Sequence, residues 1–432
     1  MEDWRRRTSR SSFTGFVVED ATSAGGWIAL RDPTWCGFRP FEDAACGPRE
    51  SLERWSPVRT RLRPFEYMAW ARRVPGDSAI NLTASGMADF LSEGEVPESF
   101  GAALDVGALS SRARAPQVYG EFCAAVAERY GVAPECVTPT LGSSQAIMHA
   151  MFAWVRAGDH VIVERPTYEP LHRVPELLGA NVSRLERKFD EGWEVVADRL
   201  AQLLTPRTRA VVLSNLHNPS GVALGTKTLE VVAEMAARVG AVVMIDEVYL
   251  DYAFDRDGAQ GTTPACIAVE NAVSWSSTTK AFGFGALRAG WIVSRNPGCA
   301  EAMAMASHYL QVDMPLASLE LATRVLHNSD MLEARAHQAT AAGRERVAEW
   351  VSRESRVSWV EPSAGASCVI RLPDLVSDQA FAEHLRSSHD TQVVPGTFFD
   401  APGTVRLSFA IDVDLLDRGL DNFSSALDGF EP

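Results

Sequence analysis

The residues most able to do chemistry lie in one loop that contains a lysine and an arginine. Lys280 follows a short apolar segment and precedes glycine-rich chain, with Arg288 eight residues further on. A lysine held among small hydroxyl residues beside a fixed cation can have its pKa lowered enough to act as an amine nucleophile. Arg288 could bind a phosphate dianion, although an arginine alone is more often part of a structural ion pair.

Two earlier segments place polar side chains after apolar runs. Asn218 lies in a rigid Asn-Pro turn that follows residues 209–215, and Asp246 ends the apolar run 240–246. Taken alone, Asn218 would be a turn former and Asp246 a helix cap. Together with Lys280 they favour a functional site.

The elements that must position these residues are strands of a parallel sheet. From about residue 130, short apolar runs alternate with longer helical patterns, which is typical of strand-helix-strand units. The expected strands are residues 160–164, 209–215, 240–246, 273–276 and 290–294. Because such sheets bind ligands beyond the carboxyl ends of their strands, we expect a site built from the following loops.

After about residue 320 the pattern changes to that of an α+β lobe. We expect a long charged helix over 330–354, short strands at 357–359 and 367–372, and another helix from 378. A chain of 432 residues exceeds the size of one ordinary core, so a second domain is expected.

The segments resemble fold-type I pyridoxal-phosphate enzymes, in particular the class I/II aminotransferase family that includes aspartate aminotransferase. Lys280, with Ser277 before it and Arg288 and Gly290 after it, matches the S-x-x-K motif with its later arginine and glycine. Residues 218–221 match N-P-[ST]-G, and residues 246–249 match D-E-x-Y. The likeness covers roughly residues 65 to 428.

The resemblance implies the fold and its domains. We expect an α/β, three-layer PLP-transferase fold, with a mostly parallel central sheet in the large domain and a smaller α+β C-terminal domain. The expected parts are an N-terminal extension (1–64), a segment contributing to the small domain (65–115), the large pyridoxal-phosphate domain (116–320) and the small C-terminal domain (321–432).

The resemblance also implies a role for each catalytic residue. Lys280 would hold pyridoxal 5′-phosphate as a Schiff base and move a proton as general base and acid. Asp246 would pair with the ring nitrogen and keep it protonated. Asn218 and Tyr249 would hydrogen-bond the ring 3′-oxygen.

The remaining site residues follow from the same likeness. The phosphate would lie on Gly142, Ser143 and Ser144 at a helix N-terminus, where amides without acceptors and the helix dipole favour anions. Ser277 and Arg288 would close this cup, and Tyr168 would stack on the ring. Without the motif, a serine pair there is equally an ordinary helix cap, and a lone tyrosine more often belongs to the core.

For the substrate, the resemblance implies that Arg406 grips an α-carboxylate, a geometry that suits the planar guanidinium. Gly86 would give close backbone approach to the same carboxylate, and Asn218 would lie beside it. Tyr119 directly precedes Gly120, which departs from the family's spacing for a tyrosine that reaches a neighbouring active site. No arginine or lysine can be assigned to a second, side-chain carboxylate, so aspartate-type specificity is not supported.

Composition limits the other function classes. The net charge of −15 and pI near 5.1 oppose binding to nucleic acid and to anionic membranes. The seven cysteines are scattered and never in a C-x-x-C spacing, which predicts reduced thiols in a cytoplasmic protein without a metal site. The first residues lack a secretory signal, no membrane-spanning run occurs, and the tryptophan-rich start predicts an ordered extension.

The predicted function is therefore amino-group transfer between an L-amino acid and a 2-oxo acid in a homodimer, the assembly implied by the family. The same apparatus could instead run a cyclase, lyase, decarboxylase or oxidase reaction on an amino acid, because fold does not fix the outcome. A ligand-sensing regulator would need a basic DNA-binding segment, and we find none.

Overall fold

The computed structural model describes residues 62–74, 78–88, 100, 104–109, 111–253, 263–374 and 376–430. The chain from Arg61 to Pro432 forms one compact unit. The predicted N-terminal extension, residues 1–64, lies outside the described residues except for its last three positions.

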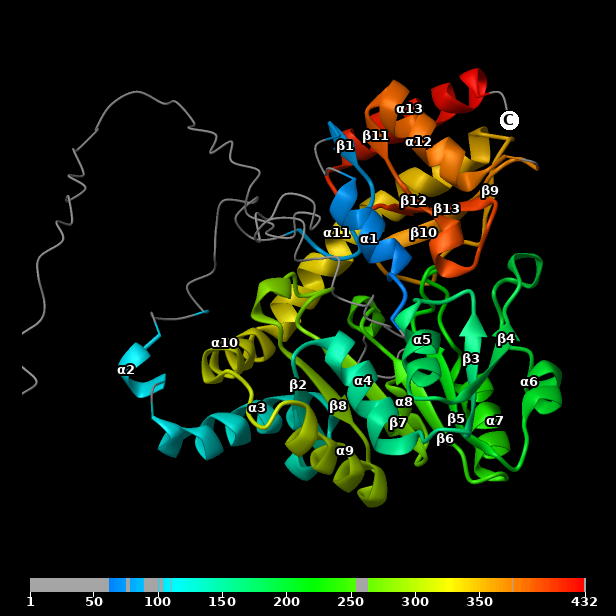
Figure 1. Cartoon of the computed structure of the whole chain (residues 1–432). Helices are drawn as coiled ribbons and strands as arrows, with labels where there is room; N and C mark the ends of the chain where they lie inside the picture. The colour runs from blue at the N-terminus through cyan, green and yellow to red at the C-terminus, as the bar shows by residue number, and fades with distance from the viewer. Residues whose placement is uncertain are drawn as a thin grey trace, which may run out of the picture. The chain divides into compact units, whose positions relative to one another are not determined.

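A central sheet, with seven strands within the described chain, carries the site (Figure 1). In spatial order the strands are β2 (Val137–Thr140), β8 (Gly290–Val293), β7 (Ala272–Ser277), β6 (Val242–Asp246), β5 (Thr208–Ser214), β3 (His160–Arg165) and β4 (Asn181–Glu186). The pairs from β7 to β4 are parallel, whereas β8 is antiparallel to both of its neighbours. The prediction of a mostly parallel central sheet is confirmed, and all five predicted strand segments fall on its strands.

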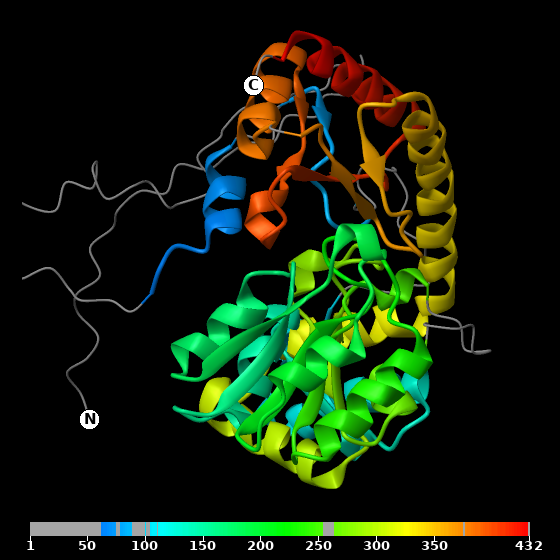
Figure 2. The same ribbon diagram turned by 90° about the vertical axis from the view of Figure 1, so that its right-hand side faces the viewer.

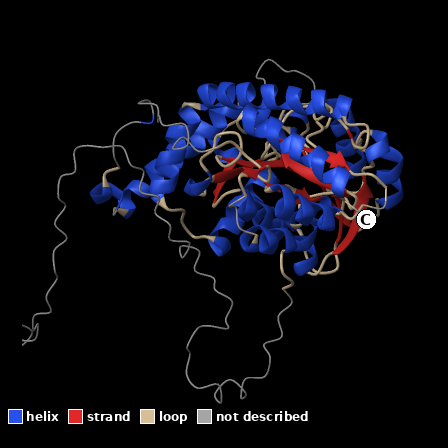
Figure 3. Ribbon diagram, turned by 90° about the horizontal axis from the view of Figure 1, so that it is seen from above, coloured by secondary structure: helices blue, strands red, loops and turns tan. Residues whose placement is uncertain are grey.

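Alternating strand residues divide the core into two apolar layers, one on each face of this sheet. On β5, Ala210 and Val212 belong to one cluster, and Val211 and Leu213 belong to the other. Because successive strand side chains point to opposite faces, this division places helices on both sides. Figure 3 shows the helices on the two faces of the central strands, which gives the three-layer architecture expected from the sequence.

The helices of the two layers differ. The first cluster is covered by α3 (Ala115–Tyr130), α4 (Ser143–Trp154), α5 (Pro170–Leu177), α9 (Pro297–Leu310) and α10 (Leu316–His327). The second is covered by α6 (Ala197–Leu203), α7 (Thr226–Ala237) and α8 (Ala265–Ala268). Two further helices, α1 (Glu66–Arg73) and α2 (Val106–Leu109), precede them in the chain.

The smaller lobe is an antiparallel sheet with helices. Its strand order is β12 (Val394–Pro395), β13 (Thr404–Ser408), β10 (Ser367–Arg371) and β9 (Ser358–Trp359). The helices α12 (Asp378–His389) and α13 (Val413–Gly429) pack on it, and β1 (Ile80–Asn81) pairs with β11 (Thr391–Gln392). Ile80 and Leu82 are buried in this lobe's core, so a segment from early in the chain is part of it. The predicted domain limits themselves remain a prediction.

One long helix belongs to both cores. α11 (Ser329–Arg353) contributes Leu332 and Ala336 to the first cluster beside the large sheet, and Val347 and Trp350 to the core of the small lobe. Figure 2 shows it running along one side of the molecule between the two lobes. Among the described residues no helix is long and apolar enough to cross a membrane.

The contact between α11 and Phe409, the residue after β13, predicts the effect of one substitution. A Cβ atom added at Gly343 would overlap the carbonyl oxygen of Phe409 and lie 2.9 Å from its carbonyl carbon. Alanine favours helices over glycine by about 1 kcal/mol, but this overlap is with backbone and cannot be relieved by a side-chain rotation. Gly343→Ala should therefore lower the free energy of unfolding by about 2 kcal/mol net, measured by urea denaturation.

A second glycine provides the control for this measurement. Gly120, inside α3, has no atom within 4 Å of an added Cβ. Gly120→Ala should stabilise the protein by roughly 0.5–1 kcal/mol. Equal effects of the two substitutions would contradict the packing described for α11.

Candidate active site

The site lies where the parallel strands end. Glu164 on β3, Ser214 on β5 and Asp246 on β6 are all buried and lie at or next to the carboxyl ends of adjacent strands, and Ser214 pairs with Asp246 in the register. Ser277 ends β7 beside them and is 1% exposed. The sheet thus brings polar side chains from distant parts of the sequence to one edge.

Lys280 lies in the loop after β7 and is held by an earlier loop of the chain. Its Nζ donates a hydrogen bond to the Ser85 hydroxyl at 2.6 Å and lies 5.6 Å from the centre of the Tyr249 ring. The Lys280 carbonyl accepts from the Met87 amide and from the Tyr252 hydroxyl, both at 2.9 Å. The amine is therefore fixed over the sheet edge by its own main chain and by one hydroxyl.

Gly86 lies against the same lysine. A Cβ added there would be 3.1 Å from the Lys280 carbonyl oxygen and 3.2 Å from its Cα. The predicted close backbone approach at Gly86 is therefore observed, but toward Lys280, while its expected role at a substrate carboxylate stays a prediction.

Asp246 presents a buried carboxylate that interacts with the charge of this amine. It is 6% exposed, and its Oδ1 accepts a hydrogen bond from the Val248 amide at 3.3 Å. Burial raises the pKa of Asp246 to about 7, because the charged form loses most of its hydration. A cationic ring nitrogen placed at this carboxylate would restore the charged form.

Two tyrosines line the space above Asp246. Tyr249 is 7% exposed, and Tyr168 follows β3 with Ser144 as a hydrogen-bond partner. Burial raises the pKa of Tyr168, so its hydroxyl stays protonated at neutral pH. Both predicted aromatic residues therefore come together with Asp246 and Lys280.

The residues predicted to hold a phosphate lie at the N-terminus of α4. Gly142 is the residue before the helix, with φ of 76°, and Ser143 and Ser144 form its first turn. The first amides of a helix have no acceptor within it, which makes this end suitable for an anion. The Arg288 guanidinium reaches the same place, donating to the Leu141 carbonyl at 3.4 Å.

Arg406 lies on β13 of the small lobe and points back to the large sheet. It is 2% exposed; its Nη1 donates to Asn218 Oδ1 at 3.4 Å, and its Nη2 donates to the Tyr67 hydroxyl at 3.0 Å. Its guanidinium carbon also lies 4.7 Å from the centre of the Phe399 ring. The structure thus brings Arg406 together with Asn218, and their roles toward a substrate stay predictions.

Sequence reasoning missed two residues that touch this machinery. Tyr67 comes from α1, whose sequence carries no motif, and Ser85 precedes the predicted Gly86 without having been singled out. The pKa of Tyr67 is lowered because the positive charges of Arg406 and Lys280 outweigh the opposing effect of burial. The position of Ser85 next to Gly86, where a close backbone approach was predicted, was the one signal in the sequence that could have indicated it.

The sequence assigns no role to Tyr119. In the structure its hydroxyl accepts a hydrogen bond from the Met314 amide, in the segment between α9 and α10. Tyr119 is half-buried, so within one chain it supports that connection.

The residues fit pyridoxal phosphate. Asp246 supplies a buried carboxylate for the ring nitrogen, Lys280 an amine for the aldehyde, and the α4 terminus with Arg288 a cup for the phosphate. The close packing of the cup points the same way, since a Cβ at Gly142 would lie 2.5 Å from Arg288 Nη2. Which of these residues contact the cofactor stays a prediction.

This packing makes Gly142 a test of the cup. Its backbone conformation, φ 76° and ψ 174°, is one that residues with a side chain almost never adopt. Gly142→Ala should therefore move Arg288 and weaken binding of pyridoxal phosphate at least about tenfold, a loss that corresponds to about 1.4 kcal/mol. Equilibrium dialysis of the cofactor measures the change, and unaltered affinity would contradict the assignment.

The buried acid at 246 predicts a pH dependence. Its pKa in the folded protein, about 7, lies above the ordinary value of 3.8, so between these values the folded state binds a proton that the unfolded state has lost. Stability therefore falls as pH rises from about 4 to 7, by up to about 4 kcal/mol from this group. Urea unfolding of the cofactor-free protein should show this decline, and Asp246→Asn should reduce it; equal slopes for both proteins would refute the argument.

The family comparison agrees with the geometry. Residues 78–423 match the family model described as aminotransferase class I and II. The aspartate/prephenate aminotransferase of Thermus thermophilus is 28% identical over 367 residues, covering 82% of this chain and 92% of that protein.

Two further similarities concern other reactions. The capreomycidine synthase of Streptomyces vinaceus is 28% identical over 306 residues, covering 70% of this chain and 78% of that protein. The crystal structure of the PLP-dependent cyclase OrfR superimposes with a TM-score of 0.72 at 28% identity, covering 86% of this chain and 99% of that one.

The family match spans most of the chain, including every predicted site residue, and the fold and cofactor-type site agree with it. The chain belongs to the class I and II aminotransferase family of pyridoxal-phosphate-dependent enzymes.

Proposed function

We propose that the protein moves an amino group between an L-amino acid and a 2-oxo acid, with pyridoxal phosphate carried covalently on Lys280. The observation that carries this proposal is that the Lys280 amine, the Asp246 carboxylate and the Arg406 guanidinium converge on one site. When bound, the cofactor withdraws electrons from the amino acid's Cα and so makes its C–H bond acidic.

The chain's residues would divide the remaining work. Lys280, once released by the incoming amino group, is the base that takes the Cα proton and the acid that returns it on the cofactor side. Ser85, bonded to Nζ at 2.6 Å, would hold the amine in place during this transfer. Asp246 would stay charged opposite the ring nitrogen and keep that nitrogen protonated.

Substrate orientation would depend on Arg406 and Asn218. The guanidinium offers two parallel donors, the arrangement that best fits a carboxylate. Because Arg406 is nearly enclosed by Tyr67, Asn218 and Phe399, a carboxylate must replace one of these contacts to reach it. The negatively charged α-carboxylate of an amino acid meets this requirement.

We propose that the working unit is a homodimer. Support comes from exposed apolar side chains on α4 and α9 and just after α9, namely Phe152, Met305, Tyr309 and Val312. Tyr309 is 81% exposed, and its ring centre lies 6.2 Å from that of Phe152. Exposed apolar groups gathered in this way are typical of a protein interface. A cytoplasmic location stays a prediction, resting on the scattered cysteines.

A second candidate function is cyclisation or another conversion of an amino acid without amino transfer. Its specific support is the similarity to a PLP-dependent cyclase and to a synthase. The same residues could serve both chemistries, because each begins with removal of a proton at Cα. Consumption of a 2-oxo acid in turnover separates the two.

The proposal predicts the consequences of losing the amine. Lys280→Ala should abolish the visible absorbance band of the bound cofactor and lower turnover at least about 1,000-fold, because the covalent link and the proton carrier are both removed. A panel of amino acids with 2-oxoglutarate or pyruvate, followed by product analysis, measures turnover.

Lys227 on α7 supplies the matched control. Lys227→Ala removes a lysine outside the site and should leave both the band and turnover unchanged. An unchanged band in Lys280→Ala would overturn the proposal, and product formation without any 2-oxo acid would favour the second candidate.

A further inference from the structure

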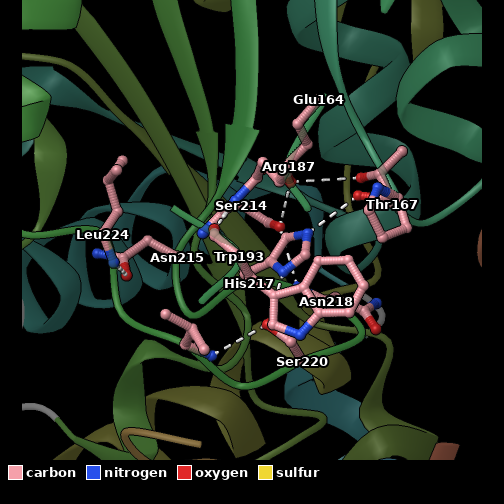
Figure 4. Close-up of polar contacts among 12 residues, drawn as sticks. Glu164, Thr167, Arg187, Trp193, Ser214, Asn215, His217, Asn218, Ser220 and Leu224 are labelled. Carbon is pink, nitrogen blue, oxygen red and sulfur yellow. Dashed lines mark hydrogen bonds and ion pairs between the residues drawn. The ribbon is translucent and has the colours of Figure 1, made fainter. Parts of the chain in front are cut away.

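A fully buried ion pair lies close to the Asn218 turn. Arg187 Nη1 lies 2.7 Å from Glu164 Oε2, and their side chains are 1% and 0% exposed. Figure 4 shows the Glu164 and Arg187 side chains close together, above Asn218 in that view. A pair removed from water is costly unless further hydrogen bonds satisfy its remaining atoms, so its other contacts indicate what it does.

The second carboxylate oxygen leads to Asn218. Glu164 Oε1 accepts hydrogen bonds from the Ser214 hydroxyl and, at 3.4 Å, from the Thr167 hydroxyl. The Ser214 oxygen in turn accepts from the Asn218 main-chain amide at 3.1 Å. One serine therefore connects the buried charge to the backbone of a predicted cofactor-binding residue.

The Asn218 side chain continues this chain of contacts. An arginine can only donate, so the bond from Arg406 Nη1, 3.4 Å long, fixes the carbonyl oxygen of the amide toward Arg406. The amide nitrogen is then the donor that this side chain can offer to a ligand. Hydrogen bonds thus run from Arg187 through Glu164 and Ser214 to the main chain of Asn218, and the side chain of the same residue meets Arg406.

A neutral network holds the other side of the same turn. His217 Nε2 lies 3.0 Å from the Pro166 carbonyl, which can only accept, and Nδ1 lies 2.6 Å from the Ser220 hydroxyl. Burial keeps the pKa of His217 well below its usual value, so this ring is uncharged. Of the two networks, the one that carries a charged pair reaches Asn218 through Ser214, from Glu164 (Figure 4).

We propose that Glu164 is a positioning residue that acts through Ser214 to fix the main chain of Asn218, and with it the place of the Asn218 side-chain amide, with Arg187 as the counter-charge that permits a carboxylate there. A fixed amide donates to the cofactor's 3′-oxygen while its carbonyl oxygen aligns Arg406 for the substrate carboxylate. This role rests on the proposed function, since Asn218 matters only if it contacts that oxygen.

The pH midpoint of the holoenzyme's visible band reports the donated hydrogen bond. A donor at the 3′-oxygen stabilises the deprotonated form of the bound cofactor, so its loss raises the midpoint. Other charged and titratable groups also face the site and act on this midpoint. They are Asp246 on β6, Tyr249 after β6, Tyr168 after β3, Tyr67 on α1, Arg406 on β13, Glu164 on β3, and Lys280 and Arg288 after β7.

Ser214→Ala in the holoenzyme breaks the relay and removes one donor from Glu164 Oε1, but it leaves the contact between Arg187 and Glu164 Oε2 in place. The midpoint should rise by about half a pH unit, and KM for the amino acid should rise about fivefold, as expected for loss of one hydrogen bond. Thr167→Val is the matched control, because it removes a hydroxyl from the same carboxylate oxygen and keeps the side-chain shape, while the Asn218 main-chain amide keeps its bond to Ser214. It should leave the midpoint and KM unchanged.

The outcomes distinguish a failure of the inference on Glu164 from a failure of the proposed function. If Ser214→Ala lowers the melting temperature but leaves midpoint and KM at wild-type values, Glu164 is merely structural and the inference fails. If the wild-type protein shows no Lys280-dependent band, the proposed function fails instead, and the inference with it. Should Ser214→Ala not fold, Ser214→Cys keeps the shape with a weaker acceptor, and must shift the midpoint in the same direction by a smaller amount.

Discussion

The direction of the strands in the central sheet is the constraint on which the rest of the site depends. Because β3, β5, β6 and β7 run parallel, the residues that end them meet along one edge although they are far apart in the chain. Glu164, Ser214 and Asp246 are neighbours for this reason alone. The loop after β7 then places Lys280 over the same edge, and α4 begins beside it.

Burying charges at that edge requires partners, and the partners connect the two lobes. Glu164 is neutralised by Arg187, and Asp246 interacts with the charge of the Lys280 amine. Arg406 comes from the small lobe and meets Asn218 of the large one, while Ser85 from early in the chain meets Lys280. The site is therefore assembled only when both lobes are folded against each other, and a change in any one contact is felt at several residues.

Much of this arrangement could be predicted from the sequence, because local signals marked it. Apolar runs that end in Asp246 or in the Asn218 turn identify strand ends, and parallel order then implies that they converge. Tyr67 could not be predicted, since α1 has no motif and its contact with Arg406 depends on how distant segments pack. The Glu164–Arg187 ion pair could not be predicted for a similar reason. In the sequence, charged residues at the ends of apolar strands look solvent-exposed, and only the fold shows that they are buried.

The central claim is that one lysine holds the cofactor, and the chain permits a direct test because it contains only three lysines, Lys188, Lys227 and Lys280. Holoenzyme reduced with sodium borohydride, digested and analysed by mass spectrometry would locate the covalent attachment. The structure predicts the cofactor's mass on the peptide that contains Lys280 and on neither of the others. Attachment at Lys188 or Lys227, or no attachment at all, would contradict it.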